Sequence, residues 1–411
     1  MTSVEDPASP VVTTPRRPAR GGARERLLDA LRAAGPVSRV ELAARTGLTE
    51  ASVSTTVKRL LAEGVVVEVG QSRTAGKPRT LLQLDPGGRT AVGIDLATTT
   101  VTYVLTSQTG GILARLTRRI APTADAAELA SRLARDVDRL LAGSGTDRGT
   151  CLGIGLVWGG PDGGLLRRTG RDAEVSTVVV DADGLRRELT RVTGWPVLVE
   201  NDATAAAVGE YWVARLDASR SFAALYLGGG LGAGIVLEGT ALRGARGMAG
   251  EFGHVCVEPD GPACRCGGRG CLEVVAGPDV VVRRAVEDPQ ARTEAGLDET
   301  SRRALSTEFA AVARAARTGG SACRVLLDES ARHVAAAAET LVNLLDLDLL
   351  VLTGPGFAAA PGIYSTAITD RFGAASSRVW RRPVTVTVSS AAATAPAVGA
   401  AALLLQERLT R

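Results

Sequence analysis

The chain has 411 residues, of which 45% are hydrophobic and 22% charged, a balance typical of globular proteins. This length allows two to four domains. The sequence has no apolar run of the roughly 20 residues that a membrane-spanning helix needs and no apolar stretch typical of a signal peptide. We therefore expect a cytoplasmic protein with no membrane partner.

The formal net charge of +4 is unevenly distributed. Residues 1–85 hold 13 Lys and Arg against 9 Asp and Glu, so the remainder is neutral. A positive excess at one end indicates a polyanionic partner there. On charge alone, an ordinary solvated surface explains the excess as well.

Residues 21–85 have the pattern of a winged helix-turn-helix domain. The proline-rich residues 1–20 in front of them are expected to form a disordered tail. Apolar spacing predicts helices over 23–34, after the N-cap Ser38 and over about 50–63. Two β-prone runs, 65–69 and 80–84, enclose a basic loop containing glycine, as the two strands of a wing would.

A winged helix places its third helix in the major groove and its wing against phosphates. The side chains expected on the outward face of the third helix are Ser52, Ser54, Thr55, Lys58 and Arg59. Those expected on the wing are Arg73, Lys77 and Arg79. The alternative is a small helical domain that docks another protein, but three cations in a loop between strands favour double-stranded DNA.

Beyond Asp85 the pattern changes to strands alternating with helices, which predicts an α/β fold over residues 90–411. A hairpin followed by helices occurs twice, from about residue 91 and from about residue 222. We therefore expect two similar lobes with a cleft between them.

One histidine and three cysteines follow a metal-ligand pattern, His254-x9-Cys264-x-Cys266-x4-Cys271. Structural zinc is held by four nitrogen or sulfur ligands in a tetrahedron, and the glycines at 267, 268 and 270 allow tight loops around one ion. The alternative is three buried free thiols. We interpret the other cysteines, Cys151, Cys256 and Cys323, as small core residues and His333 as an ordinary helix residue.

Several motifs resemble the ROK family of repressors, open reading frames and sugar kinases. They are the runs 250–254 (GEFGH) and 264–273 (CRCGGRGCLE), residues 200–203 (ENDA), the glycine loop 227–234, and residues 343–346 leading to 352–356. The resemblance covers about residues 21–405. The winged helix in front, with Gly76-Lys77-Pro78-Arg79 in its wing, is similar to the repressor branch.

The resemblance implies a two-lobed, actin-like ATPase (sugar-kinase-like) fold with sugar in the cleft. It implies that sugar hydroxyls contact Asn201, Asp202, Glu251, His254 and Glu273. In a kinase of this family Asp202 would be the catalytic base, since a carboxylate at the attacking hydroxyl can take its proton. Without the resemblance, Asn201 and Asp202 are explained as a helix N-cap.

The phosphate-binding loops depart from the kinases that the chain resembles. Where those kinases have Asp-x-Gly-Gly-Thr, this chain has Asp95-Leu96-Ala97-Thr98-Thr99. Where they have Gly-Thr-Gly, Gly229 replaces the threonine. Side chains at Ala97 and Thr98 would crowd phosphates that approach glycine backbone closely. The residues after Trp158 and the stretch 171–183 also depart from the family pattern, so the resemblance does not identify the ligand.

We therefore expect a transcription regulator, a repressor rather than an enzyme, that carries structural zinc, responds to a sugar or sugar-derivative effector and binds DNA as a homodimer or homotetramer. Two alternatives stay open. One is an active ATP-dependent sugar kinase with a DNA-binding appendage. The other is a DNA-binding scaffold that no longer takes a ligand.

Overall fold

A computed structural model describes residues 22–72, 78–97, 100–119, 125–158, 181–214, 221–298, 303–375 and 383–410. Its first part is a small domain of three helices and a three-stranded sheet of order β1-β3-β2. The helices are α1 (Ala23–Ala34), α2 (Arg39–Thr46) and α3 (Glu50–Ala62), and the strands are β1 (Val37–Ser38), β2 (Val66–Gln71) and β3 (Thr80–Leu84). This is the predicted winged helix-turn-helix. The tip of the wing, residues 73–77, lies outside the described residues.

Local signals explain where the helices of this domain begin and end. Ser38 caps α2 in a reciprocal capping box with Glu41, and the Thr49 hydroxyl accepts the Ser52 N–H at 3.2 Å to cap α3. Gly47 ends α2 in the left-handed conformation at φ 66°. The fully buried side chains of Leu27, Val53, Val57 and Leu60, together with strand β3, form its core.

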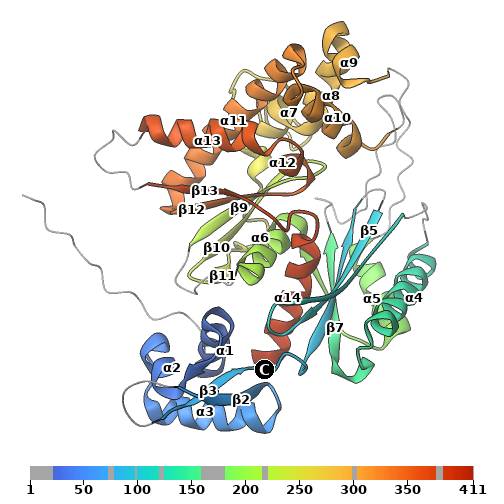
Figure 1. Ribbon diagram of the computed structural model, residues 1–411. Coiled ribbons are helices and arrows are strands. Elements are labelled where there is room, and N and C mark those ends of the chain that lie inside the picture. Colours follow the sequence, from blue (N-terminus) through green and yellow to red (C-terminus); the bar gives the residue numbers. More distant parts are fainter. Residues whose placement is uncertain are drawn as a thin grey trace, which may run out of the picture.

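The rest of the chain forms two lobes, each built on a five-stranded sheet (Figure 1). The first has the order β6-β5-β4-β7-β8 and the second the order β11-β10-β9-β12-β13. In both, the first three strands in chain order are antiparallel and the last two run parallel to the first. The shared order confirms the two similar lobes predicted from the repeated hairpins.

The elements of the lobes have the following bounds. The first contains β4 (Thr90–Leu96), β5 (Thr100–Ser107), β6 (Ile112–Arg119), α4 (Ala126–Ser144), β7 (Cys151–Trp158), α5 (Ala182–Thr193) and β8 (Val197–Asn201). The strands of the second are β9 (Phe222–Leu227), β10 (Leu231–Leu237), β11 (Thr240–Ala241), β12 (Leu349–Thr353) and β13 (Thr385–Val388). Its helices are α7 (Leu272–Ala276), α8 (Pro278–Glu287), α9 (Pro289–Ala295), α10 (Leu305–Arg317), α11 (Ser321–Leu345), α12 (Pro355–Ala359) and α13 (Pro361–Ala375).

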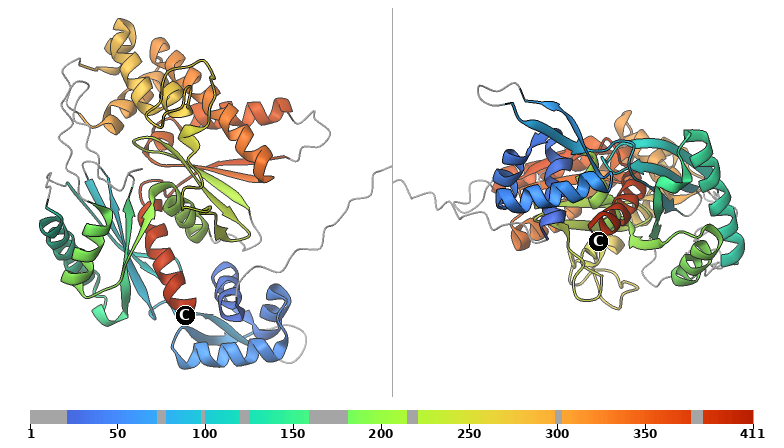
Figure 2. Two further views of the ribbon diagram at one scale, coloured as in Figure 1. Left: turned by 180° about the vertical axis from the view of Figure 1, so that it is seen from behind. Right: turned by 90° about the horizontal axis from the view of Figure 1, so that it is seen from below.

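Two helices, α6 (Asp202–Val213) and α14 (Ala395–Thr410), lie side by side between the sheets, and α14 ends beside the winged helix (Figures 1 and 2). Glycines bring their backbones into contact. A Cβ on Gly399 would lie 1.7 Å from the Ala205 carbonyl oxygen, and one on Gly209 would lie 2.0 Å from that of Ala395. A Cβ on Gly93 of β4 would likewise lie 1.7 Å from the Ala397 carbonyl oxygen. Helix α14 is therefore fixed to both α6 and the first sheet.

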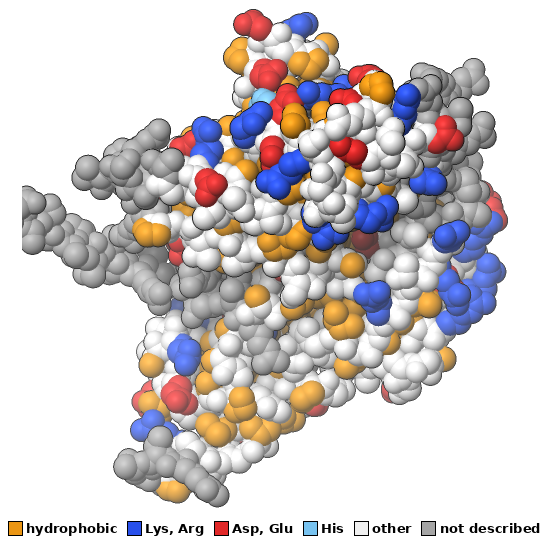
Figure 3. Space-filling view, turned by 45° about the horizontal axis from the view of Figure 1, so that its top comes forward, with side chains coloured by type: hydrophobic (Ala, Val, Ile, Leu, Met, Phe, Trp, Pro, Cys, Tyr) orange, Lys and Arg blue, Asp and Glu red, His pale blue; other side chains and the backbone are white. Residues whose placement is uncertain are grey.

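The surface of the two lobes carries its cations unevenly. In one space-filling view, Lys and Arg side chains gather on the side of the first lobe where β6 and α4 lie (Figure 3). Among the described residues, no helix is long and apolar enough to span a membrane.

Filling the contact between α6 and α14 should destabilise the protein. Because the Ala205 carbonyl is backbone and cannot rotate away, we expect Gly399→Ala to cost about 1–3 kcal/mol or more. The control is Gly143→Ala on α4, where a Cβ meets nothing within 4 Å and the loss of backbone freedom on folding falls by about 0.5–1 kcal/mol. Thermal unfolding should give a lower midpoint for the first variant and an equal or higher midpoint for the second. Equal midpoints for Gly399→Ala and the unmutated protein would contradict the packing argument.

Candidate functional site

The predicted zinc ligands converge on one point at the edge of the second lobe. The ligand atoms of His254, Cys264, Cys266 and Cys271 all lie within 4.8 Å of one another. Cys266 Sγ is 3.6 Å from Cys271 Sγ, and Cys264 Sγ is 3.5 Å from His254 Nδ1. In a zinc tetrahedron with Zn–S bonds of about 2.3 Å, adjacent sulfurs stand about 3.8 Å apart. The four side chains therefore fit a zinc ion in number, chemistry and spacing.

The loop that carries these ligands is held against α11. Gly270 adopts φ 61°, and a Cβ there would lie 1.5 Å from the Glu258 carbonyl oxygen, so the turn requires glycine. The Glu258 carboxylate lies 2.9 Å from Nε2 of His333 on α11. The interpretation of His333 as an ordinary helix residue therefore misses this anchoring contact. The interpretation of Cys256 as a core residue is wrong: its side chain is exposed, whereas Cys151 and Cys323 are buried.

The two ring nitrogens of His254 have different neighbours. Its Nδ1 faces Cys264, and its Nε2 lies 3.9 Å from the Glu251 carboxylate. Glu273 is the second residue of α7, two positions after Cys271. One of its carboxylate oxygens would lie 2.9 Å from a Cβ on either Gly230 or Gly253. If Nδ1 binds zinc, Nε2 carries the proton and can donate it in a hydrogen bond.

Asn201 and Asp202 lie where β8 passes into α6. The Asn201 side chain caps the helix by accepting the N–H groups of Ala203 at 3.0 Å and Thr204 at 3.2 Å. Burial, with smaller contributions from the nearby charges of Glu251 and Glu273, raises the pKa of the Asp202 carboxyl to about 6. The structure thus brings the predicted sugar-contacting carboxylates to one place, while Asn201 also makes the cap contact expected of it without a ligand.

The loops on the nucleotide side are described in part. Ala97 follows β4, and its side chain is exposed in the turn to β5, where its N–H donates to the Thr100 carbonyl at 3.0 Å. Thr98 lies outside the described residues. Gly229 is at the tip of a tight turn closed by the Gly228 N–H and the Gly230 carbonyl at 3.0 Å.

The predicted DNA-contacting side chains lie mainly on one exposed face of α3. Ser54, Thr55, Lys58 and Arg59 are exposed and Ser52 is half-buried, while the opposite face is in the core. Arg79, on the wing, is exposed. Arg73 and Lys77 lie outside the described residues.

The winged helix is fastened to the lobes by three side chains. Arg32 of α1 is 4% exposed, donates to the Tyr211 carbonyl at 3.3 Å, and stacks its guanidinium 4.1 Å from the centre of the Tyr211 ring. Gln108, fully buried after β5, donates to the carbonyls of Val65 at 3.0 Å and Asp85 at 2.7 Å. Arg24 bonds the Leu409 carbonyl at the end of α14. The DNA-binding domain thus contacts the far ends of α6 and α14.

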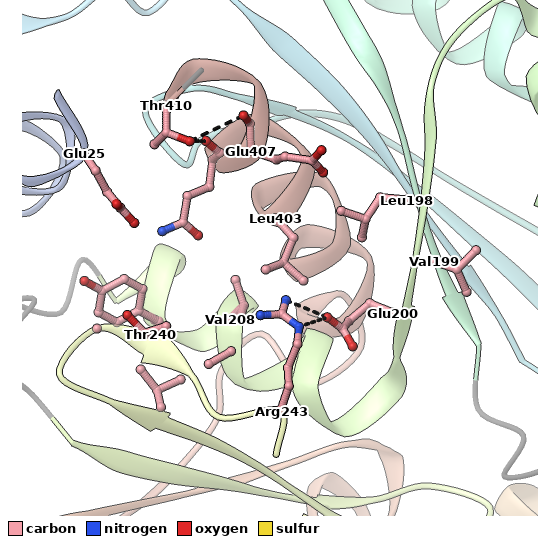
Figure 4. Close-up of a pocket in the computed structure, with 15 residues that line it drawn as sticks. Glu25, Leu198, Val199, Glu200, Val208, Thr240, Arg243, Leu403, Glu407 and Thr410 are labelled. Atoms are coloured by element: carbon pink, nitrogen blue, oxygen red, sulfur yellow. Dashed lines mark hydrogen bonds and ion pairs between the residues drawn. The ribbon is translucent and has the colours of Figure 1, made fainter. Parts of the chain in front are cut away.

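A cavity of about 450 Å³ lies at this junction (Figure 4). Glu25 of α1 lines it on one side, and Leu403 and Thr410 of α14 line another. On its remaining side Arg243 from the second lobe bonds Glu200 of β8 at 2.8 and 3.1 Å, an ion pair that joins the two lobes. The winged helix and both lobes therefore meet around one space.

The fold and site together define a two-lobed protein of the sugar-kinase type that carries a winged helix. The ROK family pattern matches residues 91–407 and a MarR family pattern matches residues 25–77. The chain belongs to the ROK family.

Both repressors and kinases are among the proteins similar to this chain. A xylose repressor of Caldicellulosiruptor bescii is 27% identical over 77% of this chain and 78% of its own length. A glucokinase of Halalkalibacterium halodurans is 31% identical over 64% of this chain and 79% of its own length.

Solved structures show the same fold. A ROK family transcriptional regulator, described as a homologue of the E. coli MLC protein, superposes with a TM-score of 0.70 at 23% identity and covers 94% of this chain and 96% of its own. A Streptomyces griseus ROK glucokinase, solved with glucose and AMPPNP, has a TM-score of 0.58 at 27% identity and covers 76% of this chain and 98% of its own.

Sequence reasoning missed the residues of the domain junction. Arg32 follows Leu28 by one helical turn on the buried face of α1, and a charge on an apolar face is a signal that it has a partner. The partner Tyr211 lies 179 residues further along the chain, so no local pattern identifies it. Gln108 gives no sequence signal at all.

We expect purified protein to contain one zinc per chain, measured by atomic emission. Cys266→Ser should remove the metal because it takes away one of four ligands. Cys256→Ser is the matched control, since Cys256 is in the same segment but is not one of the four. A folded protein without metal, or equal zinc in both variants, would rule out the assignment.

Proposed function

We propose that this protein is a DNA-binding transcriptional repressor whose sugar-kinase-like domain binds a sugar or sugar-derivative effector. The observation that carries the proposal is the direct fastening of a winged helix, with its polar α3 face exposed, to the helices that lead from the cleft. The MarR family match and the xylose repressors among the relatives support it. Residues 21–85 are assigned to DNA and residues 90–411 to the effector.

In this proposal the effector lies beside the start of α6. Asn201, Asp202, Glu251 and Glu273 bind its hydroxyls, and His254 donates from Nε2 while its Nδ1 binds structural zinc. A sugar offers hydroxyls that both donate and accept, so a mixed set of carboxylates, an amide and an imidazole suits it. On DNA, the exposed side chains of α3 read bases, and the wing cations Arg73, Lys77 and Arg79 meet phosphates.

The second candidate function is an active sugar kinase. The glucokinases among the relatives favour it, and in a kinase Asp202 would be the catalytic base. Ala97 and Gly229 argue against kinase activity. Compared with the kinases that the chain resembles, Ala97 adds a side chain and Gly229 lacks a hydroxyl where phosphates would bind. We propose that the protein has no kinase activity and that it binds two half-sites as a homodimer or homotetramer.

The proposed function is tested by footprinting the full chain on DNA flanking its own gene, with and without a panel of sugars and sugar phosphates. We expect a two-fold-symmetric footprint that weakens with salt, because phosphate contacts release counterions, and that one compound releases. Asp202→Asn should keep the footprint and lose the release. No footprint at low salt would refute DNA binding. ADP release with any hexose that Asp202→Asn abolishes would establish the kinase instead.

Removing the Arg32 contact between the winged helix and α6 should weaken the effect of the effector on DNA affinity. Arg32→Ala removes a buried stacking contact worth about 2 kcal/mol and a charged hydrogen bond worth about 1.5–3 kcal/mol. We therefore expect the ratio of DNA affinities without and with effector to fall at least tenfold towards one. The matched control is Arg148→Ala, which removes an arginine stacked 3.9 Å over Trp195 in the first lobe. If both variants keep the full ratio in a binding titration, the junction does not transmit the signal.

A further inference from the structure

Tyr226 is the residue before the end of β9, and its side chain points towards α6. In the sheet it stands beside Thr353 of β12 and Gly232 of β10. The Thr353 hydroxyl bonds Glu210 of α6 at 2.9 Å, and a Cβ on Gly232 would lie 2.8 Å from the Ala203 side chain. Neighbours in register share a face of a sheet, so Tyr226 lies over the first turns of α6.

The Tyr226 ring lies between two glycine loops. A Cβ on Gly228 would lie 2.6 Å from its Cε1 atom, and a Cβ on Gly354 would lie 3.0 Å from its Cδ2 and Cε2 atoms. These loops follow β9 and β12, which are parallel neighbours, so both emerge at the same edge of the second sheet. Glycine loops at such an edge offer backbone N–H groups to phosphates, which must approach closely. Here an aromatic ring already occupies that approach.

Two carboxyl groups lie near the ring. Asp95 is the residue before the end of β4 in the first lobe and Asp202 begins α6, and the charges of both add to burial in raising the pKa of the Tyr226 hydroxyl well above its usual value. Burial, and then the charge of Asp202, raises the pKa of Asp95 to about 7. A polyphosphate beside these carboxylates would be repelled by their charge unless a cation lay between them.

The role of Tyr226 differs from that of the other tyrosines. Tyr103, Tyr211 and Tyr364 are at most 3% exposed and belong to the hydrophobic cores. Tyr226 is only partly buried and has glycine backbone and carboxyl groups around it. Core packing therefore does not account for an aromatic residue at this position.

Building on the proposed sugar-binding function, we propose that Tyr226 closes the phosphate subsite of the cleft, so that the domain accepts a sugar and excludes nucleoside triphosphates. The exclusion is steric. It adds to the side chain at Ala97 and the missing hydroxyl at Gly229. The cleft is thereby reduced to a receptor for the sugar alone.

The test is calorimetric titration of the zinc-loaded full chain with AMPPNP and Mg²⁺. The opening variant is Tyr226→Thr, since threonine suits a strand, with Tyr226→Ala as a second opening variant. The matched control is Tyr226→Phe, which keeps the ring and loses only the hydroxyl. We expect the unmutated protein and Tyr226→Phe to show no binding up to millimolar nucleotide, and both opening variants to bind at least tenfold more tightly than that limit.

Binding of AMPPNP by the unmutated protein, or no binding by either opening variant, overturns the proposal. Zinc content and the DNA footprint, measured on the same samples, report whether each variant is folded. Failure of the proposed function can be told apart from failure of this proposal. If the proposed function is wrong, the unmutated protein gives no DNA footprint, while the nucleotide titration still shows whether Tyr226 excludes AMPPNP.

Discussion

Helices α6 and α14 touch backbone to backbone, because glycine occupies the crossing points on both. Gly209 lies against the Ala395 carbonyl and Gly399 against that of Ala205, at distances that leave no room for a side chain. Gly93 and Gly155 extend the same close approach from α14 to β4 and β7. Interiors packed this tightly shift between discrete arrangements rather than deform gradually. The two helices therefore act as one rigid body between the lobes.

This rigid body has the candidate effector site at one end and the DNA-binding domain at the other. Asp202 begins α6, and Tyr211, near its end, holds Arg32. The last turn of α14 bonds Arg24 of the same domain. A change in the angle between the lobes would move these contacts together and with them the winged helix. A ligand can cause that change only by binding one arrangement more tightly than the other.

The sequence predicts elements best where local signals agree. Helix 23–34 and strand 80–84 have the expected bounds, because the apolar pattern agrees there with the flanking glycines and prolines. Helix α14 was not predicted, because it is apolar on almost every side and shows no helical period. The zinc ligands lie within 18 residues and could be found by spacing. The junction residues Arg32, Gln108 and Tyr211 depend on contacts between distant segments, which no local pattern records.

A kinase and a receptor with this fold must discriminate between different pairs of states. A kinase must bind the transition state of phosphoryl transfer more tightly than its substrates, which requires phosphates held by glycine loops beside Asp202. A receptor needs only unequal affinity for two arrangements of its lobes, and about 5.5 kcal/mol moves a two-state equilibrium from 1:99 to 99:1. A side chain that fills the phosphate-binding space would prevent tight binding of the transition state. It would leave unequal affinity for the two lobe arrangements possible. The Glu200–Arg243 ion pair joins the two lobes and the Arg32 contact joins the winged helix to α6. A change in the angle between the lobes would therefore reach the winged helix through these contacts.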